Sequence, residues 1–205
     1  MTTASDPAHE RLRAFRARNQ RYLDLGHDRA RAARFIVESA PSCPGPALDV
    51  GTGKGLLAVA LAQKGLDVVS VDVDVAEQAL ARLLAGEAGV DRRIHFLHGD
   101  AARLSYPEEH FGCAAMMDVL HHLADPGPVL REMARVLRRG GVAILADFDE
   151  EGFALVARVH RDEGGAHART ATTVPLARDM LLAAGFRCSR QTRGCLHDVA
   201  VLTKP

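Results

Sequence analysis

The chain has 205 residues, of which 47% are hydrophobic and 25% charged, so it has room for one globular domain with a proper core. Its 26 basic residues balance 26 acidic residues. A chain without net charge offers no basic field to collect nucleic acid or an anionic membrane, which argues against both as partners.

The chain begins with two predicted helices. Asp6 and Pro7 suit the cap and first turn of the first helix, which places Leu12, Phe15, Tyr22 and Leu23 near one face. Asp28 can cap the second helix, which ends at Pro41. The residues expected to point inward from this second helix are Ala33, Ile36, Val37 and Ala40.

Short apolar strands then alternate with helices. A loop over 41–46 leads into a strand at 47–50, and four further strands are predicted at 67–71, 93–97, 111–117 and 142–148. The intervening helices begin near Leu56, Asp74 and Asp125; Asp74 and Glu77 have capping-box spacing, and Gly140-Gly141 is expected to end the last of them. This alternation predicts βαβ units and a mostly parallel sheet.

The last part of the chain changes character. Residues 149–173 form a longer polar connection with one helix expected over Phe153 to Val159. A helix from Val174 to Ala184 should end at Gly185. Two strands, 186–193 and 196–203, are separated by a tight turn at Gly194, so they should pair antiparallel. One domain is the economical interpretation.

Cysteine spacing and apolar runs bear on the compartment. Cys43, Cys113, Cys188 and Cys195 form no CxxC pair and no zinc-like spacing, and a domain of this size needs no disulfide framework. The first residues lack the apolar core of a signal peptide, and no apolar run reaches the length of a membrane span. We expect a soluble, cytoplasmic protein with reduced thiols.

A glycine loop, Gly51-Thr52-Gly53-Lys54-Gly55, joins the first strand to a helix. Glycines let the backbone turn sharply and let a ligand approach, and the helix N-terminus presents free N–H groups. The third glycine comes one residue too early for a dinucleotide GxGxxG loop, and no GK[ST] ends the segment as in a phosphate loop. The alternative interpretation is a strand–helix turn without a ligand.

Four further features follow the other predicted strands, and they favour a ligand. Asp72 ends the second strand, where a carboxylate can accept both hydroxyls of a ribose, and Asp100 in HGDA closes the third. The run DVLHHLADP, residues 118–126, follows the fourth strand, and RVLRRGG, residues 135–141, precedes the fifth. In open α/β sheets ligands bind beyond the carboxyl ends of the strands, so these segments should converge on one crevice.

The ordered set LDVGTGKG, VDVD, HGDA, DVLHHLADP and RVLRRGG resembles the class I S-adenosylmethionine-dependent methyltransferases, nearest to the small-molecule branch that includes the ubiquinone and menaquinone enzymes. The resemblance covers residues 46–148 closely and the last helix and hairpin in outline. It implies a Rossmann-like three-layer α/β sandwich whose seven-stranded, mostly parallel sheet ends in an antiparallel C-terminal hairpin.

The resemblance also implies how the single domain of residues 1–205 is divided. The N-terminal helices, 1–41, would cap the site, and 46–148 would form the cofactor-binding core. Residues 149–173 would contribute to the acceptor pocket, and 174–205 would form the terminal helix and hairpin. The cofactor would be S-adenosyl-L-methionine, with S-adenosyl-L-homocysteine as product.

Each matching position takes a role from the family. Gly51, Thr52, Gly53 and Gly55 would approach the methionine part of the cofactor, and Asp49 would orient its ammonium group. Asp72 would hold the ribose hydroxyls, and Val73 would pack on the adenine. Asp100 would accept from the adenine amine beside Ala101, and Asp118 and Leu120 would line the methionine side near the sulfonium.

Catalytic residues are less clearly marked. Methyl transfer from a sulfonium mainly requires alignment, and a base is needed only when the nucleophile must lose a proton. His121 and His122 are the first candidates, either as a base or as packing residues. Asp147, Asp149, His160 and His167 form a second group, whose alternative is a solvated connection. No HxxxH or HExxH spacing supports a metal, so we expect none.

The leading hypothesis is therefore methyl transfer to a small-molecule acceptor. A second is a non-catalytic regulatory or assembly protein that binds S-adenosylmethionine or S-adenosylhomocysteine, which the absence of a clear base favours. A third, a nicotinamide-dependent oxidoreductase, is disfavoured by the early third glycine. The identity of the acceptor and the oligomeric state stay open, with a homodimer possible.

Overall fold

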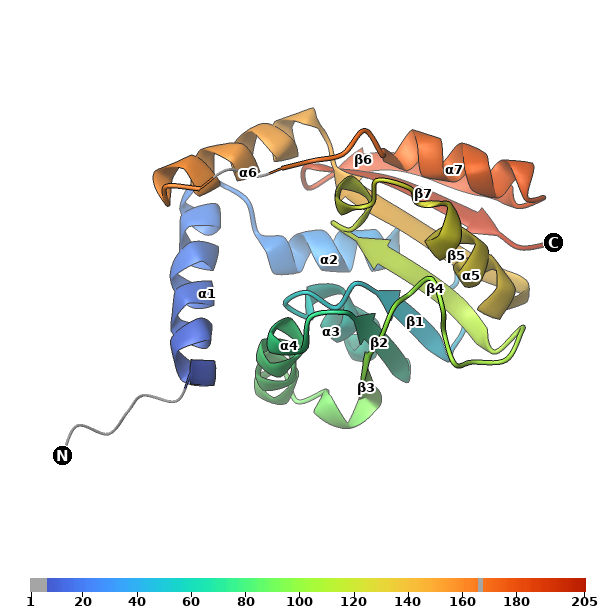
Figure 1. Ribbon diagram of the computed structural model, residues 1–205, viewed down its shortest axis with the longest axis horizontal. Coiled ribbons are helices and arrows are strands. Elements are labelled where there is room, and N and C mark those ends of the chain that lie inside the picture. Colours follow the sequence, from blue (N-terminus) through green and yellow to red (C-terminus); the bar gives the residue numbers. More distant parts are fainter. Residues whose placement is uncertain (1–6, 166–167) are drawn as a thin grey trace.

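The computed structural model describes residues 7–165 and 168–205, which fold as an α/β sandwich (Figure 1). The helices are α1 (Pro7–Asp24), α2 (Arg29–Glu38), α3 (Leu56–Gln63), α4 (Val75–Glu87), α5 (Gly127–Val136), α6 (Glu150–Asp162) and α7 (Val174–Ala183). The strands are β1 (Ala47–Val50), β2 (Val68–Asp72), β3 (Ile94–His98), β4 (Phe111–Met117), β5 (Leu137–Phe148), β6 (Arg187–Gly194) and β7 (His197–Thr203). Two short 3-10 turns, η1 (Asp91–Arg93) and η2 (Leu120–His122), precede β3 and follow β4.

The seven strands form one sheet in the order β3-β2-β1-β4-β5-β7-β6. The first five pair in parallel, and β7 returns antiparallel between β5 and β6. All seven residues of β4 are buried, as expected of a central parallel strand covered on both faces. The predicted fold class, including the antiparallel terminal hairpin, is confirmed.

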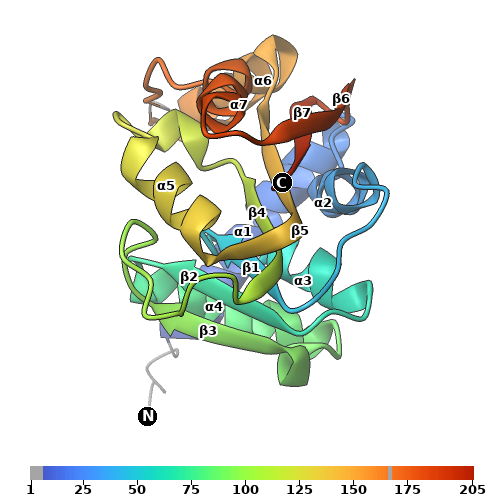
Figure 2. The same ribbon diagram turned by 90° about the vertical axis from the view of Figure 1, so that its right-hand side faces the viewer.

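Helices cover both faces of the sheet, as Figure 2 shows along its edge. Helices α2, α3 and α4 share one apolar core with the sheet, and α5 and α7 share the other. Helix α1 packs outside these layers: Leu12 and Phe15 contact Leu80 of α4, and Tyr22 contacts Val156 and Val159 of α6. In Figure 1, α1 stands at the end of the sheet, with α6 across its upper end. None of the helices formed by the described residues is long and apolar enough to cross a membrane.

Two of the predicted helix caps are confirmed. The Asp28 carboxylate accepts from the Arg31 backbone N–H at 2.9 Å, and Asp74 accepts from Ala76 and Glu77. The reciprocal half of the capping box is replaced, because the Glu77 carboxylate binds the Lys54 ammonium instead. The predicted cap at Asp6 lies outside the described residues.

Three local predictions are wrong. Leu23 is 41% exposed rather than turned inward with Tyr22. Strand β5 starts at Leu137, because Leu137 pairs with Phe111 and the Gly140-Gly141 segment continues the strand through hydrogen bonds to Lys204. The hairpin turn falls on Cys195 and Leu196.

The hairpin turn is displaced from the predicted Gly194 for a packing reason. Cys195 and Leu196 both have left-handed φ angles, +51° and +63°, as a two-residue turn that matches the strand twist requires. Gly194 is the last residue of β6, where a Cβ would lie 2.7 Å from the ring of Phe35 in α2. The glycine therefore serves a close approach of α2, not the turn.

Candidate functional site

A cavity of about 580 Å³ opens at the carboxyl ends of the parallel strands. It lies where the order reverses between β1 and β4, the usual ligand position in such sheets, and its size suits a small molecule. The predicted site residues that line it are Gly51, Thr52, Gly53, Asp72, Val73, Asp100, Ala101, Asp118, His121, His122 and His160. The wall does not include Asp49, Gly55 or Leu120.

The three loop glycines have left-handed φ angles but serve different purposes. A Cβ on Gly51 would collide with Val119, and one on Gly55 would lie 2.8 Å from the Cβ of Ala81 in α4. A Cβ on Gly53 would meet nothing within 4 Å. Gly51 and Gly55 therefore permit close packing of the protein on itself, while Gly53 leaves open space at the cavity wall.

The carboxylate of Asp72 lies against this loop from the end of β2. Its Oδ2 accepts from the Gly53 backbone N–H at 2.8 Å, and its Oδ1 accepts from the Asp74 N–H at 2.9 Å. Val73 is 69% exposed although it is apolar, and Asp100 accepts from the Ala102 N–H at 2.8 Å. At the cavity wall, the exposed Val73 together with the carboxylates of Asp72 and Asp100 suits a flat apolar ring that carries polar groups at its edges.

A buried polar network lies beneath the loop. The Ser70 hydroxyl donates to Asp49 Oδ2 at 2.7 Å and lies 2.6 Å from the Thr52 hydroxyl. The Thr52 hydroxyl also accepts a hydrogen bond from the side-chain amide of Gln78. The Asp49 side chain is fully buried, and its Oδ1 has no hydrogen-bond partner among the described residues. Burial raises the pKa of Asp49 to about 7. Asp49 and the Thr52 side chain thus support the loop from below.

Leu120 is likewise placed away from the cavity. It is fully buried in the apolar core shared with α5 and α7, so its predicted contact with the methionine part of a cofactor has no support in this placement. Its packing instead anchors η2, the short turn that carries His121 and His122. The neighbouring Asp118 does line the cavity.

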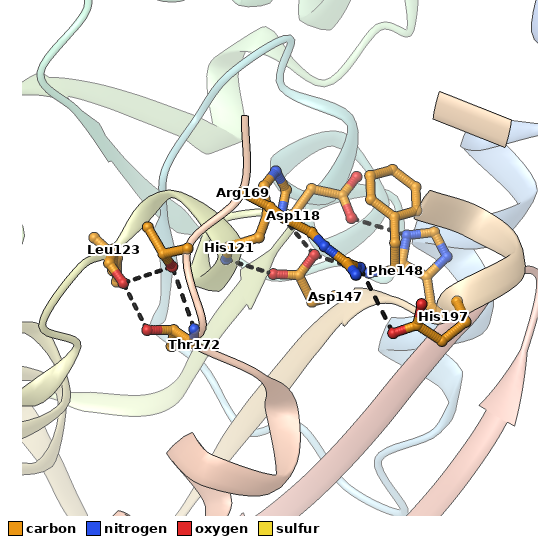
Figure 3. Close-up of polar contacts among 10 residues, drawn as sticks. Asp118, His121, Leu123, Asp147, Phe148, Arg169, Thr172 and His197 are labelled. Atoms are coloured by element: carbon orange, nitrogen blue, oxygen red, sulfur yellow. Dashed lines mark hydrogen bonds and ion pairs between the residues drawn. The ribbon is translucent and has the colours of Figure 1, made fainter. Parts of the chain in front are cut away.

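His121 forms a buried pair with Asp147, which ends the buried part of β5 (Figure 3). Its Nδ1 lies 2.7 Å from Asp147 Oδ1, and its backbone N–H donates to Oδ2 at 2.9 Å. Because a carboxylate only accepts, Nδ1 carries the hydrogen of the neutral ring and Nε2 is the basic nitrogen. His121 also lines the cavity, so this arrangement can place a proton acceptor there.

The other predicted histidines occupy different positions. The ring of the exposed His122 lies close to that of His121, with centroids 3.9 Å apart and the planes tilted by 50°; the pKa of His122 is lowered first by burial and then by the charge of His121. His160 lines the cavity from α6, where burial and then Arg18 lower its pKa. His167 lies outside the described residues. Among residues 7–165 and 168–205, no cluster of three or more His, Cys, Asp or Glu side chains suits a metal ion.

A short segment, residues 168–173, crosses η2 (Figure 3). The Thr170 backbone N–H donates to the His121 carbonyl at 2.8 Å, and the hydroxyls of Thr170 and Thr172 both donate to the Leu123 carbonyl. The Arg169 guanidinium lies 4.6 Å from the centroid of Phe153, whose ring meets His121 edge-on. These contacts hold the connection before α7 against the turn that carries His121.

Two site residues escape the sequence analysis. Arg29, the first residue of α2, is half-buried in the cavity wall and forms no ion pair among the described residues. Its guanidinium lies over Tyr22, 5.2 Å from the ring centroid, and burial lowers its pKa. His197 of β7 is fully buried and binds Asp118. Nothing local in the sequence marks either residue, because tertiary packing brings Arg29 to the cavity wall and His197 to Asp118, which lines the cavity.

Known proteins resemble this chain in sequence. Residues 48–145 match the model of the methyltransferase domain family. A 27-O-demethylrifamycin SV methyltransferase from Amycolatopsis mediterranei is 35% identical over 146 residues, covering 62% of this chain and 53% of that protein. A demethylmenaquinone methyltransferase from Mycobacterium marinum is 32% identical over 142 residues, covering 68% and 57%. The chain spans about half the length of the curated relatives it matches.

A solved structure shows the same fold at lower identity. The (4+2)-cyclase SpnF superposes with a TM-score of 0.66 at 22% identity, covering 86% of this chain and 81% of that one. Likeness at this identity shows the fold alone, and a fold does not decide a reaction. The reaction must be argued from the cavity and its residues.

Proposed function

Residues 48–145 of this chain belong to the class I S-adenosylmethionine-dependent methyltransferases, and on that premise we propose that the chain transfers a methyl group from S-adenosylmethionine to a small-molecule acceptor. One observation carries the proposal. A glycine loop with open space at Gly53, the Asp72 carboxylate and the exposed Val73 lie together on one cavity at the switch point of the sheet.

The residues present fit this cofactor. Asp72 would accept from the ribose hydroxyls, Val73 and Ala101 would flank the adenine, and Asp100 would accept from the adenine amine. Gly53 would leave room for the methionine part. The unpaired Oδ1 of Asp49 lies one layer below the loop, where a hydrogen bond relayed through water would satisfy it. Gly51 and Gly55 would act indirectly, by holding the loop against Val119 and α4.

Arg29 adds a cation to this cavity. A half-buried guanidinium with no ion pair among the described residues is costly unless an anionic group approaches it. The cofactor carries one carboxylate, on its methionine part. We assign Arg29 to that carboxylate, because a planar guanidinium can donate two parallel hydrogen bonds to it.

The chemistry requires little beyond alignment. When bound, S-adenosylmethionine supplies a methyl group already activated by its sulfonium. His121 would accept the proton that the acceptor loses, through Nε2, while Asp147 holds the ring and stabilises the imidazolium that results. We assign the proton transfer to His121, because Asp147 orients its ring, and His122 and His160, which also line the cavity, would contact the acceptor.

The base suggests what kind of acceptor is used. A paired histidine is useful only when the nucleophile carries a proton, as a hydroxyl or an acidic carbon does. Relatives named as methyltransferases of demethylrifamycin and demethylmenaquinone agree with a small organic acceptor. Tyr22, Phe148 and Val156 provide apolar wall from α1, β5 and α6, which supports the assignment of 1–41 and 149–173 to the acceptor side.

The non-catalytic alternative finds no support. Its motivation was the absence of a clear base, and the His121–Asp147 pair removes that motivation. The curated relatives reported above are all named as methyltransferases.

Calorimetric titration with S-adenosylhomocysteine, with NAD as the control ligand, tests the cofactor. We expect micromolar binding of the first and none of the second. Binding of neither would defeat the proposal, and binding of NAD would favour an oxidoreductase. An acceptor screen with hydroxylated aromatic compounds then tests methyl transfer. Binding of S-adenosylhomocysteine without methylated product from any acceptor would favour the non-catalytic alternative.

A further inference from the structure

His197, the first residue of β7, is fully buried between two hydrogen-bond acceptors. Its Nε2 lies 2.9 Å from Asp118 Oδ1, and its Nδ1 lies 2.7 Å from the Cys195 carbonyl oxygen (Figure 3). A carboxylate and a carbonyl can only accept, so both ring nitrogens carry hydrogens. His197 is therefore a buried imidazolium ion-paired with Asp118.

Asp118 is the partner that reaches the cavity. It directly follows β4, lines the cavity wall and has a left-handed φ of +60°, an uncommon conformation for a residue other than glycine. Burial raises the pKa of Asp118, but the charge and hydrogen bond of His197 outweigh burial and hold the pKa below its ordinary value. The same pair raises the pKa of His197 against the lowering effect of burial.

His197 and His27 form a stacked pair of imidazole rings, and the surrounding charged and titratable groups keep only His197 charged. His27 stacks on it with centroids 5.9 Å apart, and burial followed by the charge of His197 lowers the pKa of His27 to about 4. Asp147 of β5 adds negative charge near His197, and Arg29 of α2 adds positive charge near Asp118 and His27. At neutral pH His27 is consequently neutral beside a protonated His197.

We propose that His197 is a positioning residue whose imidazolium holds the Asp118 carboxylate at the cavity wall, against the methionine part of the cofactor. The inference rests on the function proposed above. The carboxylate would face the ammonium and sulfonium groups, whose charges it complements. Without His197, the partly buried Asp118 carboxylate would lose its ring partner and be free to turn toward Arg29.

Calorimetric titration with S-adenosylhomocysteine tests this role in the wild type, His197→Leu, His197→Gln, Asp118→Asn and the Leu/Asn double variant. We expect His197→Leu to weaken binding on the order of tenfold to a hundredfold, the scale of a hydrogen bond to a charged group. His197→Gln should stay within about threefold at pH 6.5, because its amide still donates to the carboxylate. The double variant should bind no worse than Asp118→Asn, because the two residues act as one unit.

The pH profile separates positioning from mere packing. His197 keeps its proton below its raised pKa and loses it as pH rises through that value, so wild-type affinity should fall as pH rises through the raised pKa of His197. His197→Gln should show no such fall. His27→Gln is the matched control, because His27 stacks on His197 but makes no hydrogen bond to Asp118 in the contacts described, and it should keep the wild-type affinity and profile.

Several outcomes would overturn the role of His197. The first is wild-type affinity in His197→Leu. The second is a loss of affinity in the double variant equal to the product of the losses in the two single variants. The third is a wild-type pH profile in His197→Gln. If circular dichroism shows that His197→Leu does not fold, the Gln variant decides alone. If the wild type fails to bind S-adenosylhomocysteine at any pH, the proposed function is overturned together with this inference. If the wild type binds and the variants bind with the same affinity, only the inference is overturned.

Discussion

Asp147 receives two hydrogen bonds from the same residue, one from the His121 ring at 2.7 Å and one from the His121 backbone N–H at 2.9 Å. The backbone contact fixes the position of η2, and the ring contact fixes the proton on Nδ1. A single carboxylate at the end of β5 thus sets both the location and the tautomer of the proposed base.

Asp147→Asn should impair the base without removing it. Oδ1 of Asp147 also accepts from the Phe148 backbone N–H at 2.8 Å, and Oδ2 accepts from the His121 N–H, so the amide NH2 of asparagine must face a donor whichever way it is turned. The variant also lacks the negative charge that stabilises the His121 imidazolium. We expect kcat to fall about 10²- to 10⁴-fold, the usual contribution of a general base, with little change in S-adenosylhomocysteine affinity. Single-turnover methyl transfer measures the first, and calorimetry the second.

Asp198→Asn is the control for this prediction, because Asp198 is the cross-strand neighbour of Asp147 but binds the exposed Arg193. It should keep wild-type kcat. A kcat in Asp147→Asn within threefold of wild type would remove His121 as the base.

Gly53→Ala should weaken cofactor binding without a matching loss of stability. Gly53 and Gly89 have φ angles of +46° and +69°, and a Cβ on either would meet nothing within 4 Å. An added methyl group therefore strains both positions by a similar amount, about 1 kcal/mol, but only at Gly53 does it enter the cavity. We expect S-adenosylhomocysteine affinity to fall on the order of tenfold in Gly53→Ala and to be unchanged in Gly89→Ala. Equal affinities would show that Gly53 faces no ligand.

Arg29→Gln should distinguish ligands by their carboxylate. Loss of the guanidinium should weaken S-adenosylhomocysteine about tenfold or more. It should leave 5′-methylthioadenosine unaffected, because that compound lacks the amino-acid part. Arg31→Gln, two residues along the same helix and exposed, is the control for both titrations. Equal weakening of both ligands would mean that Arg29 maintains the shape of the cavity instead of binding the carboxylate.

Asp49→Asn should stabilise the protein more at alkaline than at acidic pH. In the unfolded chain the carboxyl group ionises near its ordinary pKa of about 3.9. In the folded protein burial raises this pKa to about 7, so folding retains a proton between these values. Wild-type stability therefore falls as pH rises from about 4 to about 7, by an amount on the order of 3 kcal/mol.

Asparagine keeps the shape but does not titrate, so the difference in unfolding free energy between variant and wild type should grow between pH 4 and pH 8. Urea unfolding at both pH values measures it, and the contribution of His27 cancels because both proteins contain it. The exposed Asp67→Asn variant should change stability by less than about 0.5 kcal/mol at either pH. If the difference in unfolding free energy is the same at both pH values, the carboxyl group of Asp49 does not keep its proton in the folded protein.

The secondary structure was largely predictable because its signals are local. The run at 111–117 is continuous and apolar, and β4 has the predicted bounds. Asp28 and Asp74 cap the helices they precede, since a cap needs only the next three residues. The errors occur where a residue distant in the sequence sets the boundary of an element. Strand β5 begins early because Leu137 pairs with Phe111 and the Gly140-Gly141 segment bonds to Lys204. The hairpin turn lies after Gly194 because Phe35 occupies the space beside that glycine.

The sequence by itself determined the order of strands and helices, the glycine loop, the carboxylate that ends β2 and the one that follows β3, because these depend on periodicity and on residues close together in the chain. Only the tertiary structure decided which side chains meet. His197 and Asp118 are 79 residues apart, and His121 and Asp147 are 26 apart. The antiparallel return of β7 beside β5 brings His197 behind the cavity, and burial there, where water cannot compete, makes the pairing with Asp118 obligatory.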